Sequence, residues 1–395
     1  MTKLSSLLKC EAILRAYNRT TWEGYSKSFV GYLEDSFEKY EKALNKIGKP
    51  GLPKFVDMQS IQGLFSVFKD GILKTVRSYH EGQPGQAYQC FLEMMESAQR
   101  IYQNEETNSL FATNIEQKIT NAQNKIDLFR MRVCSNPFDI ASRSDIFHIP
   151  FEKRQYATVA RYSIPGFPSL YLGRSVYACW EEMKRPSFDN LYVSRFNFAK
   201  ATRILRLDYD PYDLLREIHE IHYDNSDFQK NLKTFLSLWP LQLSCSIPTR
   251  CNNASFYPEY IIPQMLMQWI RNKDIAGICY RTTRVPLKYK VKFTFDNRQY
   301  PPVYPLILNN YVFPVKSNQS KGYCSELSKL FQCTDPILWG VLESSSFVRP
   351  DDQKQLLNAL NFHLAPNVKI PYAQSVFGKC QLNLLSKTFQ AGEIR

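Results

Sequence analysis

The stretch RYSIPGFPSLYLGRSVYACWEE, residues 161 to 182, carries charged side chains at its two ends. Arg161 opens a segment that we expect to be a strand, and a Pro-Gly turn and an apolar run follow it. Glu181 and Glu182 lie near the end of a short predicted helix. Arginine offers a planar fork of donors that matches phosphate oxygens, and a carboxylate can stabilise developing positive charge. The pattern therefore raises the question of which substrate needs a cation and a carboxylate at opposite ends of one short element.

The two glutamates are not equivalent on a helix. Consecutive helical residues point about 100° apart, so one carboxylate should face a site and the other should not. Spacing alone leaves open whether Glu181 or Glu182 faces the site.

Four pieces of the sequence, in order, resemble the signature of RES-domain proteins, a family named for an arginine, a glutamate and a serine. In the opening stretch, Arg161, Gly166, Pro168, Leu170, Tyr171 and Glu182 are in register with that signature. LFRMR at 128–132 resembles the family's opening strand, DIAGICYRTT at 274–283 its serine-bearing strand, and NNYVFPV at 309–315 its closing strand. The resemblance covers about residues 126 to 316, and its register favours Glu182 over Glu181.

The sequence departs from that signature at three positions. Ala160 replaces a glycine, Ser163 an asparagine, and Thr282 the serine. Threonine keeps the hydroxyl but adds a methyl group, so a hydrogen bond can survive in a tighter fit.

The resemblance implies an α+β, ADP-ribosyltransferase-like fold that takes NAD as a substrate and needs no cofactor. It implies cleavage of the nicotinamide-ribose bond by hydrolysis or phosphorolysis, in a toxin or an antiphage effector. It also implies a partner antitoxin. The attacking group, water or phosphate, stays open.

The resemblance also assigns roles to individual residues. The expected catalytic set is Arg161, Glu182 and Thr282, with Glu181 as the alternative carboxylate. The expected NAD contacts are Arg130, Tyr171, Arg132, Tyr280 and His148. Each residue also has a purely structural interpretation. Arg161 would form a structural ion pair, and Glu182 would lie on an exposed helix face. Tyr171 would lie in the core, and His148 in an ordinary loop. Arg130 and Arg132 lie two apart on a predicted strand, so we expect both on the same face, with Arg130 the better match.

Two other functions remain open from the sequence. A protein of this fold can transfer ADP-ribose to a macromolecule, for which a helical N-terminal region would supply a recognition surface. The fold can also persist as a non-catalytic binding module, and the replacement of serine by Thr282 is the feature in its favour.

Periodicity divides the chain into three expected parts: a helical N-terminal domain at 1–125, the RES domain at 126–320, and a helical C-terminal extension at 321–395. Within them, helices are predicted at SKSFVGYLEDSFEKYEKALNKI, PGQAYQCFLEMMESAQRIY, NIEQKITNAQNKIDLF, VYACWEEM, DLLREIHEIH, EYIIPQMLMQWIRNK, GYCSELSKLFQ and DDQKQLLNALNF. Strands are predicted at LFRMRV, ATVARYSI, SLYLG, LYVSRFNF, RILRLDYD, IAGICYRTT, KYKVKFTF and NNYVFPV.

Composition narrows the class of protein. Hydrophobic residues make up 44% of the 395 residues, so a core can form, and no apolar run is long enough to span a membrane. Ten widely spaced cysteines without a CxxC pair favour reduced thiols and a cytoplasmic protein. His219 and His222 lack further ligands, so we expect a polar helix surface and no metal site.

The formal net charge of +13 permits nucleic-acid binding, but the basic residues are scattered, and we expect a generally basic surface with no nucleic-acid partner. Besides NAD, the partners left open are an antitoxin or regulatory protein and a second copy of the chain.

Overall fold

The computed structural model of the chain describes most of its residues. These are 28–47, 57–103, 113–114, 126–134, 142–200, 202–209, 226–250, 254–284, 306–316, 319–344, 361–365 and 368–389, with 4, 7–10, 13, 211 and 214.

The chain divides into two compact units, each built from two separate segments. The first unit combines residues 1–112 with 206–269, and the second combines 113–205 with 270–395. This differs from the expected division at 125 and 320. The insertion 206–269 groups with the N-terminal helices, because its long helix packs its apolar side chains on them. The segment from 321 is not a helical extension, because it adds strands to the sheet of the second unit.

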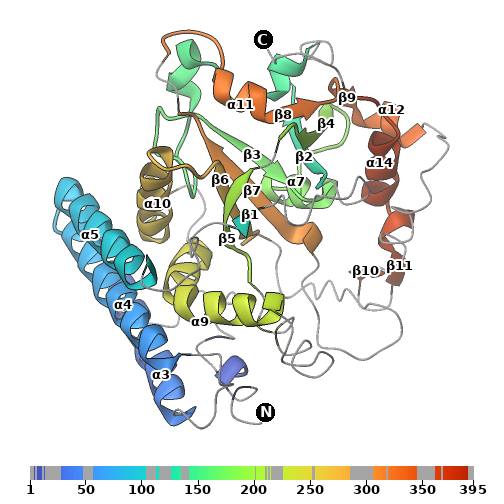
Figure 1. Ribbon diagram of the computed structural model, residues 1–395. Helices are drawn as coiled ribbons and strands as arrows, with labels where there is room; N and C mark the ends of the chain where they lie inside the picture. Colours follow the sequence, from blue (N-terminus) through green and yellow to red (C-terminus); the bar gives the residue numbers. More distant parts are fainter. Residues whose placement is uncertain are drawn as a thin grey trace. The chain divides into compact units, whose positions relative to one another are not determined.

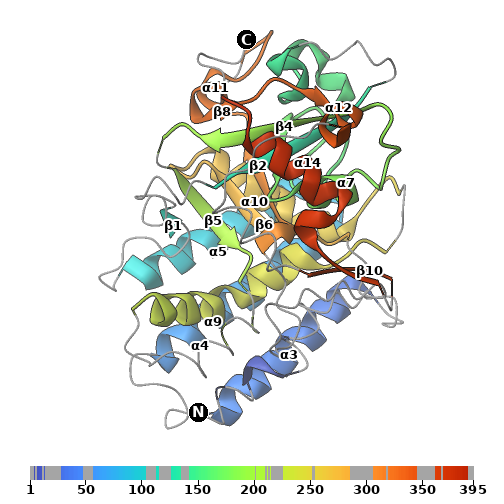
Figure 2. The same ribbon diagram turned by 90° about the vertical axis from the view of Figure 1, so that its right-hand side faces the viewer.

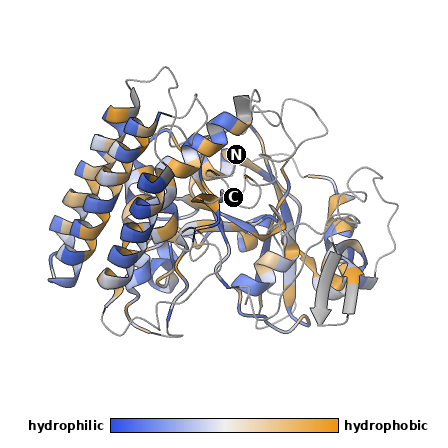
Figure 3. Ribbon diagram, turned by 90° about the horizontal axis from the view of Figure 1, so that it is seen from below, coloured by the Kyte–Doolittle hydropathy of each residue, from blue (hydrophilic) through white to orange (hydrophobic). Residues whose placement is uncertain are grey.

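The first unit is helical. Its elements are α3 Phe29–Ile47, α4 Met58–His80, α5 Pro84–Gln103, α9 Ser226–Ser246, the short η5 Pro258–Tyr260 and α10 Ile261–Arg271, which runs on into the second unit. In Figure 3 the long helices at the left carry both apolar and polar colours along their length, as amphipathic helices do. The expected helices at 84–102 and within 26–47 are confirmed, and α4 was not predicted.

Local sequence sets the boundaries of α4 and α5. Asp57 caps α4, its carboxylate accepting from the backbone N–H of Gln59 and Ser60 at 3.1 and 3.2 Å. Gly82 follows the helix in a left-handed conformation, φ 78°, which glycine adopts without a steric penalty. Pro84 then begins α5, where its missing N–H is not needed.

Aromatic side chains join α9 to α3. The ring of Trp239 stacks on Tyr40 with centroids 4.1 Å apart and meets Phe37 edge-on at 6.2 Å. Leu236, one turn before Pro240, is completely buried. These contacts hold residues distant in sequence in one core, and Figure 1 shows α9 beside α3 and α4.

A proline inside α9 is compensated by a tyrosine of α3. Pro240 has no N–H, so the carbonyl of Leu236, four residues earlier, loses its intrahelical donor. The hydroxyl of Tyr40 donates to that carbonyl at 2.8 Å. Burial raises the pKa of Tyr40 above its usual value, so the hydroxyl stays a donor.

We expect Tyr40→Phe to lower the free energy of unfolding by about 1–3 kcal/mol, because it leaves a buried carbonyl without a donor. In a Pro240→Ala background the same change should have a smaller effect, because alanine restores the backbone N–H that proline lacks. Urea denaturation of the four proteins of this double-mutant cycle checks the coupling. Equal effects of Tyr40→Phe in both backgrounds would contradict the explanation.

The second unit is built on a nine-stranded sheet with the order β1-β5-β6-β7-β3-β2-β4-β8, in which β9 also pairs with β4. The strands are β1 Thr113–Asn114, β2 Leu128–Val133, β3 Ser169–Gly173, β4 Leu191–Phe198, β5 Arg203–Leu207, β6 Gly277–Arg281, β7 Asn309–Pro314, β8 Phe331–Cys333 and β9 Ile337–Leu338. The pairs β6–β7, β7–β3, β3–β2 and β2–β4 are antiparallel. The fold is therefore α+β, as expected at that coarse level.

Short helices and a separate hairpin complete this unit. They are η3 Arg143–Ile146, η4 Phe151–Tyr156, α7 Val176–Glu182, η6 Leu306–Leu308, α11 Ser325–Leu330, α12 Trp339–Ser344, the hairpin β10 Asn361–Ala365 with β11 Val368–Pro371, η7 Tyr372–Gln374 and α14 Val376–Leu385. Figure 2 shows α14 beside α7 over strands β2 and β4.

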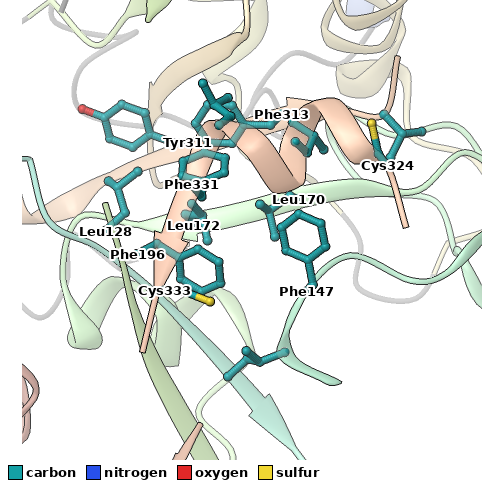
Figure 4. Close-up of a cluster of buried hydrophobic side chains, with 14 of the residues drawn as sticks. Leu128, Phe147, Leu170, Leu172, Phe196, Tyr311, Phe313, Cys324, Phe331 and Cys333 are labelled. Carbon is teal, nitrogen blue, oxygen red and sulfur yellow. The ribbon is translucent and has the colours of Figure 1, made fainter. Parts of the chain in front are cut away.

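Two clusters of buried apolar side chains form the core of this unit. One includes Leu170, Phe196, Phe313 and Phe331, which Figure 4 shows converging from four strands. The other lies around α7 and α14 and includes Trp339. The apolar positions of the strands thus fix the sheet, and the sheet fixes the ends of β6 and β7.

Several secondary-structure expectations need correction. ATVARYSI, residues 157–164, is not a strand, and only a single bridge joins Ala160 and Ser163. The predicted helix GYCSELSKLFQ is shorter and passes into β8, and Asn361 at the end of DDQKQLLNALNF lies in a strand. In NIEQKITNAQNKIDLF the described residues are strand or irregular. The strand KYKVKFTF, nearly all of the helix DLLREIHEIH, and the rest of these two helices lie outside the described residues.

Candidate functional site

Arg161 projects from a tight turn rather than from a strand. The backbone of Ala160 and Ser163 exchanges two hydrogen bonds of 3.0 and 3.1 Å around it. Gly166 closes the larger loop, its N–H donating to Ala157 at 2.9 Å with φ 79°, a conformation that favours glycine. The turn leaves only 7% of Arg161 exposed.

The guanidinium of Arg161 reaches the chain just beyond β6. Its Nη2 donates to the hydroxyl of Thr283 at 3.0 Å. Thr283 follows Thr282, so the arginine of the opening stretch lies beside the residue that stands in the family's serine position.

Helix α7 begins and ends at defined points. Ser175 caps it, accepting from Ala178 N–H at 3.0 Å and donating to the Ile307 carbonyl at 2.6 Å. After Glu182 the chain turns through Lys184 and Arg185, both left-handed at φ 63° and 59°. Two such non-glycine residues in succession are strained, which marks a turn imposed by its surroundings.

The two glutamates of α7 diverge, as the helix geometry requires. Glu181 is 3% exposed, and its two oxygens accept from Arg185 at 2.9 and 3.1 Å. Oε1 of Glu182 accepts from the hydroxyl of Thr282 at 2.5 Å and from Nδ2 of Asn310 at 2.7 Å. Glu182 therefore belongs with Thr282, whereas Glu181 is tied into a local ion pair. A catalytic role for either carboxylate stays a prediction.

The other oxygen of Glu182 faces a second arginine. Nε of Arg284 lies 3.2 Å from Oε2, with both side chains about 30% exposed. The backbone N–H of Arg284 also donates to the hydroxyl of Thr282 at 3.2 Å. Thr282 is fully buried and uses its hydroxyl both as donor and as acceptor.

If the site cleaves NAD, as the resemblance implies, Thr282→Val should lower NAD turnover about 10- to 100-fold, because valine keeps the shape but removes a hydrogen bond to a charged group. Thr282→Ser should keep most of the activity, since the hydroxyl remains. Initial rates with each purified variant, together with their thermal unfolding, check this. Full activity of the valine variant would make position 282 purely structural.

Arg130 and Arg132 do not share a role, although both lie on β2. Arg132 is exposed and donates to the carbonyl of Asp145. Arg130 is half-buried, donating through Nη1 to the carbonyl of Tyr171 at 2.8 Å, and its buried Nε has no partner among the described residues. Loss of solvent contact and the charge of Arg132 lower the pKa of Arg130 to about 10. Arg130 thus remains charged at neutral pH with spare capacity to donate.

Aromatic side chains flank the Arg161 turn. Tyr171 is partly exposed. Its hydroxyl group lies 2.7 Å from that of Ser163, and this hydrogen bond ties Tyr171 to the turn. The rings of Tyr162 and Tyr280 pack with centroids 4.7 Å apart, and both are buried. Tyr171 can therefore reach a ligand near the turn, whereas Tyr280 packs in the core against Tyr162 of the turn.

Cys179 of α7 is a neighbour of the site but is chemically inert. Its thiol donates to the carbonyl of Phe129 at 3.1 Å, and burial raises its pKa to about 12. A thiol needs its thiolate form to act as a nucleophile, so Cys179 is poorly suited to that role.

The ring of His148 is hydrogen-bonded to backbone groups and not to the side chains of the site. It is fully buried, and Nε2 accepts from the N–H of Cys324 at 2.8 Å. Nδ1 must then carry the proton, which it donates to the carbonyl of Ile149 at 2.8 Å. Because both ring nitrogens are hydrogen-bonded to the backbone, His148 has the structural role of an ordinary loop histidine.

Burial and the charge of Arg130 lower the pKa of His148 from 6.5 to about 4. The unfolded chain therefore binds more protons between these values, and stability falls as the pH falls through that range. We expect this histidine to remove about 3 kcal/mol of unfolding free energy between pH 6.5 and pH 4. Urea denaturation across that range, with His148→Gln as the control that cannot titrate, checks this. An equally steep decline in the glutamine variant would assign it to other groups.

Three residues of this cluster were not predicted as site residues: Thr283, Arg284 and Asn310. Asn310 carried a signal, because asparagine is rare in strands and yet Asn310 is the second residue of the largely apolar β7, where it is 3% exposed. Thr283 and Arg284 follow the end of β6, and only the fold brings them to Arg161 and Glu182.

No set of histidine, cysteine, aspartate and glutamate side chains in the described part of the chain gathers into a metal site. His219 and His222 lie outside that part. None of the helices that can be described has the length and apolar composition needed to cross a membrane.

No protein-family model matches the sequence, and no solved structure matches the chain. A comparison with curated proteins does find a relative. The chain is similar to "Putative toxin YopC" of Bacillus subtilis (strain 168). The two are 32% identical over 324 residues, which cover 79% of this chain and 66% of that protein. The chain thus spans just under two thirds of the length of this relative.

Proposed function

We propose that the protein is an NAD-consuming toxin or antiphage effector that cleaves the nicotinamide-ribose bond by hydrolysis or phosphorolysis. The observation that carries the proposal is the convergence of Arg161, Thr282 and Glu182. The arginine contacts Thr283, and the glutamate accepts a hydrogen bond from Thr282. This set resembles the arginine, glutamate and hydroxyl residues of the RES-domain signature. The name of the Bacillus relative supports the toxin part of the proposal.

The geometry suits the chemistry of this bond. Breaking it leaves an oxocarbenium-like ribose, which a nearby carboxylate stabilises. Thr282 and Asn310 both donate to Oε1 of Glu182 and so hold the carboxylate in one orientation. A group that is already oriented does not have to reorganise as charge develops.

Arg130 and Arg161 suit the anionic part of NAD. Guanidinium groups bind pyrophosphate oxygens through paired donors. Both side chains are largely shielded from water, so their attraction to a phosphate is weakly screened. Tyr171, half-exposed beside them, can stack on a ring of the substrate.

The test is incubation of the full chain with NAD labelled in its nicotinamide and in its adenosine part. Release of nicotinamide with free ADP-ribose indicates hydrolysis, and a phosphate-dependent phosphorylated product indicates phosphorolysis. Label retained on protein would instead indicate transfer to a macromolecule. A timed measurement of cellular NAD after induction completes the test, and an unchanged NAD pool with no turnover in vitro would overturn the proposal.

A further inference from the structure

Among the arginine–carboxylate pairs described in the second unit, three involve Asp127 or the two glutamates of α7, and these three differ in construction. Nε of Arg195 lies 2.6 Å from Oδ1 of Asp127, with the two side chains 11% and 9% exposed. Arg185 contacts both oxygens of Glu181, which is buried. Arg284 and Glu182 meet through one nitrogen and one oxygen, 3.2 Å apart, with both side chains accessible to solvent.

The burial of the carboxylate distinguishes the Arg195–Asp127 and Arg185–Glu181 pairs from the Arg284–Glu182 pair. Asp127 and Glu181 are buried, and a buried carboxylate cannot lose its partner without leaving an uncompensated charge. A pair whose two side chains are both partly exposed contributes little stability and can exchange partners. The Arg284–Glu182 pair is therefore the one of the three that a ligand can open.

This pair also occupies the reactive oxygen of the proposed site. Oε1 of Glu182 is committed to Thr282 and Asn310, so Oε2 is the oxygen that remains for a substrate. A guanidinium against Oε2 would repel positive charge developing on the ribose. Arg284 must move away before Glu182 can act.

We propose that Arg284 is a substrate-displaced switch: it pairs with Glu182 in the empty site and transfers to the pyrophosphate when the dinucleotide binds. The inference rests on the proposed function and adds the residue that couples binding to exposure of the carboxylate. The exchange is favourable because a pyrophosphate offers a guanidinium more charge and more acceptors than one carboxylate oxygen does. No covalent step is involved.

The test compares wild type with Arg284→Ala, Arg284→Gln and Arg284→Lys, all checked for cooperative thermal unfolding. For NAD turnover, the alanine variant should show KM raised at least tenfold, with kcat unchanged or higher because Oε2 is free. Lysine should restore part of the KM, whereas glutamine, which is uncharged, should not. A fall in kcat at unchanged KM would make Arg284 a positioning residue for Glu182, and no change in either constant would leave it without a role. Both results overturn the switch.

Calorimetric titration with ADP-ribose and with nicotinamide separates the switch from the proposed reaction. Arg284→Ala should weaken ADP-ribose binding about tenfold and leave nicotinamide binding unchanged. Equal ADP-ribose affinity in wild type and variant would overturn the switch even if NAD is consumed. If wild type consumes no NAD but binds ADP-ribose through Arg284, the proposed reaction fails and the switch stands. If wild type binds neither ligand, both fail.

Discussion

Glu182→Gln should reduce NAD turnover at least 100-fold while the protein stays folded. The amide keeps the size of the side chain but lacks the negative charge that opposes positive charge on the ribose. A 100-fold loss corresponds to about 3 kcal/mol of transition-state stabilisation. Because that charge develops during the reaction, the loss should fall on kcat more than on KM. Initial rates over a range of NAD concentrations check this.

Glu181→Gln is the matched control, one residue away on the same helix. It weakens the pairing with Arg185, so it should lower the unfolding temperature and leave kcat within a few-fold of wild type. The reverse result, an inactive Glu181→Gln with a fully active Glu182→Gln, would mean that the assignment within the pair is off by one. Normal activity of both would remove the carboxylate from the mechanism.

Residues 126–395 expressed alone should be insoluble, although the change in composition near residue 128 indicates a boundary there. This fragment keeps α9 but lacks α3 and α4, against which α9 packs. Phe235, Leu236 and Trp239 would lose their cover, and each is at most 1% exposed in the full chain. Burial of a large apolar side chain contributes about 1.5–3 kcal/mol, so three such losses approach the total stability of a typical domain.

Co-expression of residues 1–125 with 126–395 is the control for this experiment. The two fragments together should give at least tenfold more soluble protein, and they should copurify, because the first restores α3 and α4. A fragment 126–395 that is soluble alone, and that unfolds cooperatively, would contradict the division of the chain. It would instead indicate that the N-terminal helices fold as a separate unit.

The domain boundaries could not be predicted because the contacts that define the two units join segments distant in sequence. Helical periodicity identified Phe29–Ile47, Pro84–Gln103 and Ile261–Arg271 because an amphipathic helix repeats its apolar residues every three or four positions. That pattern marks a buried face but does not say which other face covers it. The stacking of Tyr40 on Trp239 joins residues almost 200 positions apart, and no local rule predicts such a contact.

The prediction of a strand at Arg161 was wrong for a different reason. The residues around it alternate in the manner of a strand, yet the backbone folds back at Ala160 and Ser163. Pro165 and Gly166 were predicted as a turn that ends the strand, whereas Gly166 instead closes a loop onto Ala157. The position of Arg161 beside Thr283 depends on that loop and on the end of β6.

The sequence by itself determined the types of side chain available for chemistry, the strands that carry Arg130 and Tyr171, the strand that Thr282 follows, and the helix on which the two glutamates diverge. These follow from local periodicity, because side-chain direction along a strand or helix is fixed by backbone geometry. The register of the resemblance favoured Glu182, but only the tertiary structure decided that this glutamate meets Thr282, that Asn310 and Arg284 complete its surroundings, and that His148 is committed to the backbone. Those contacts span 100 residues or more, and they exist because two clusters of apolar side chains lock β6, β7 and α7 into one sheet-and-helix core.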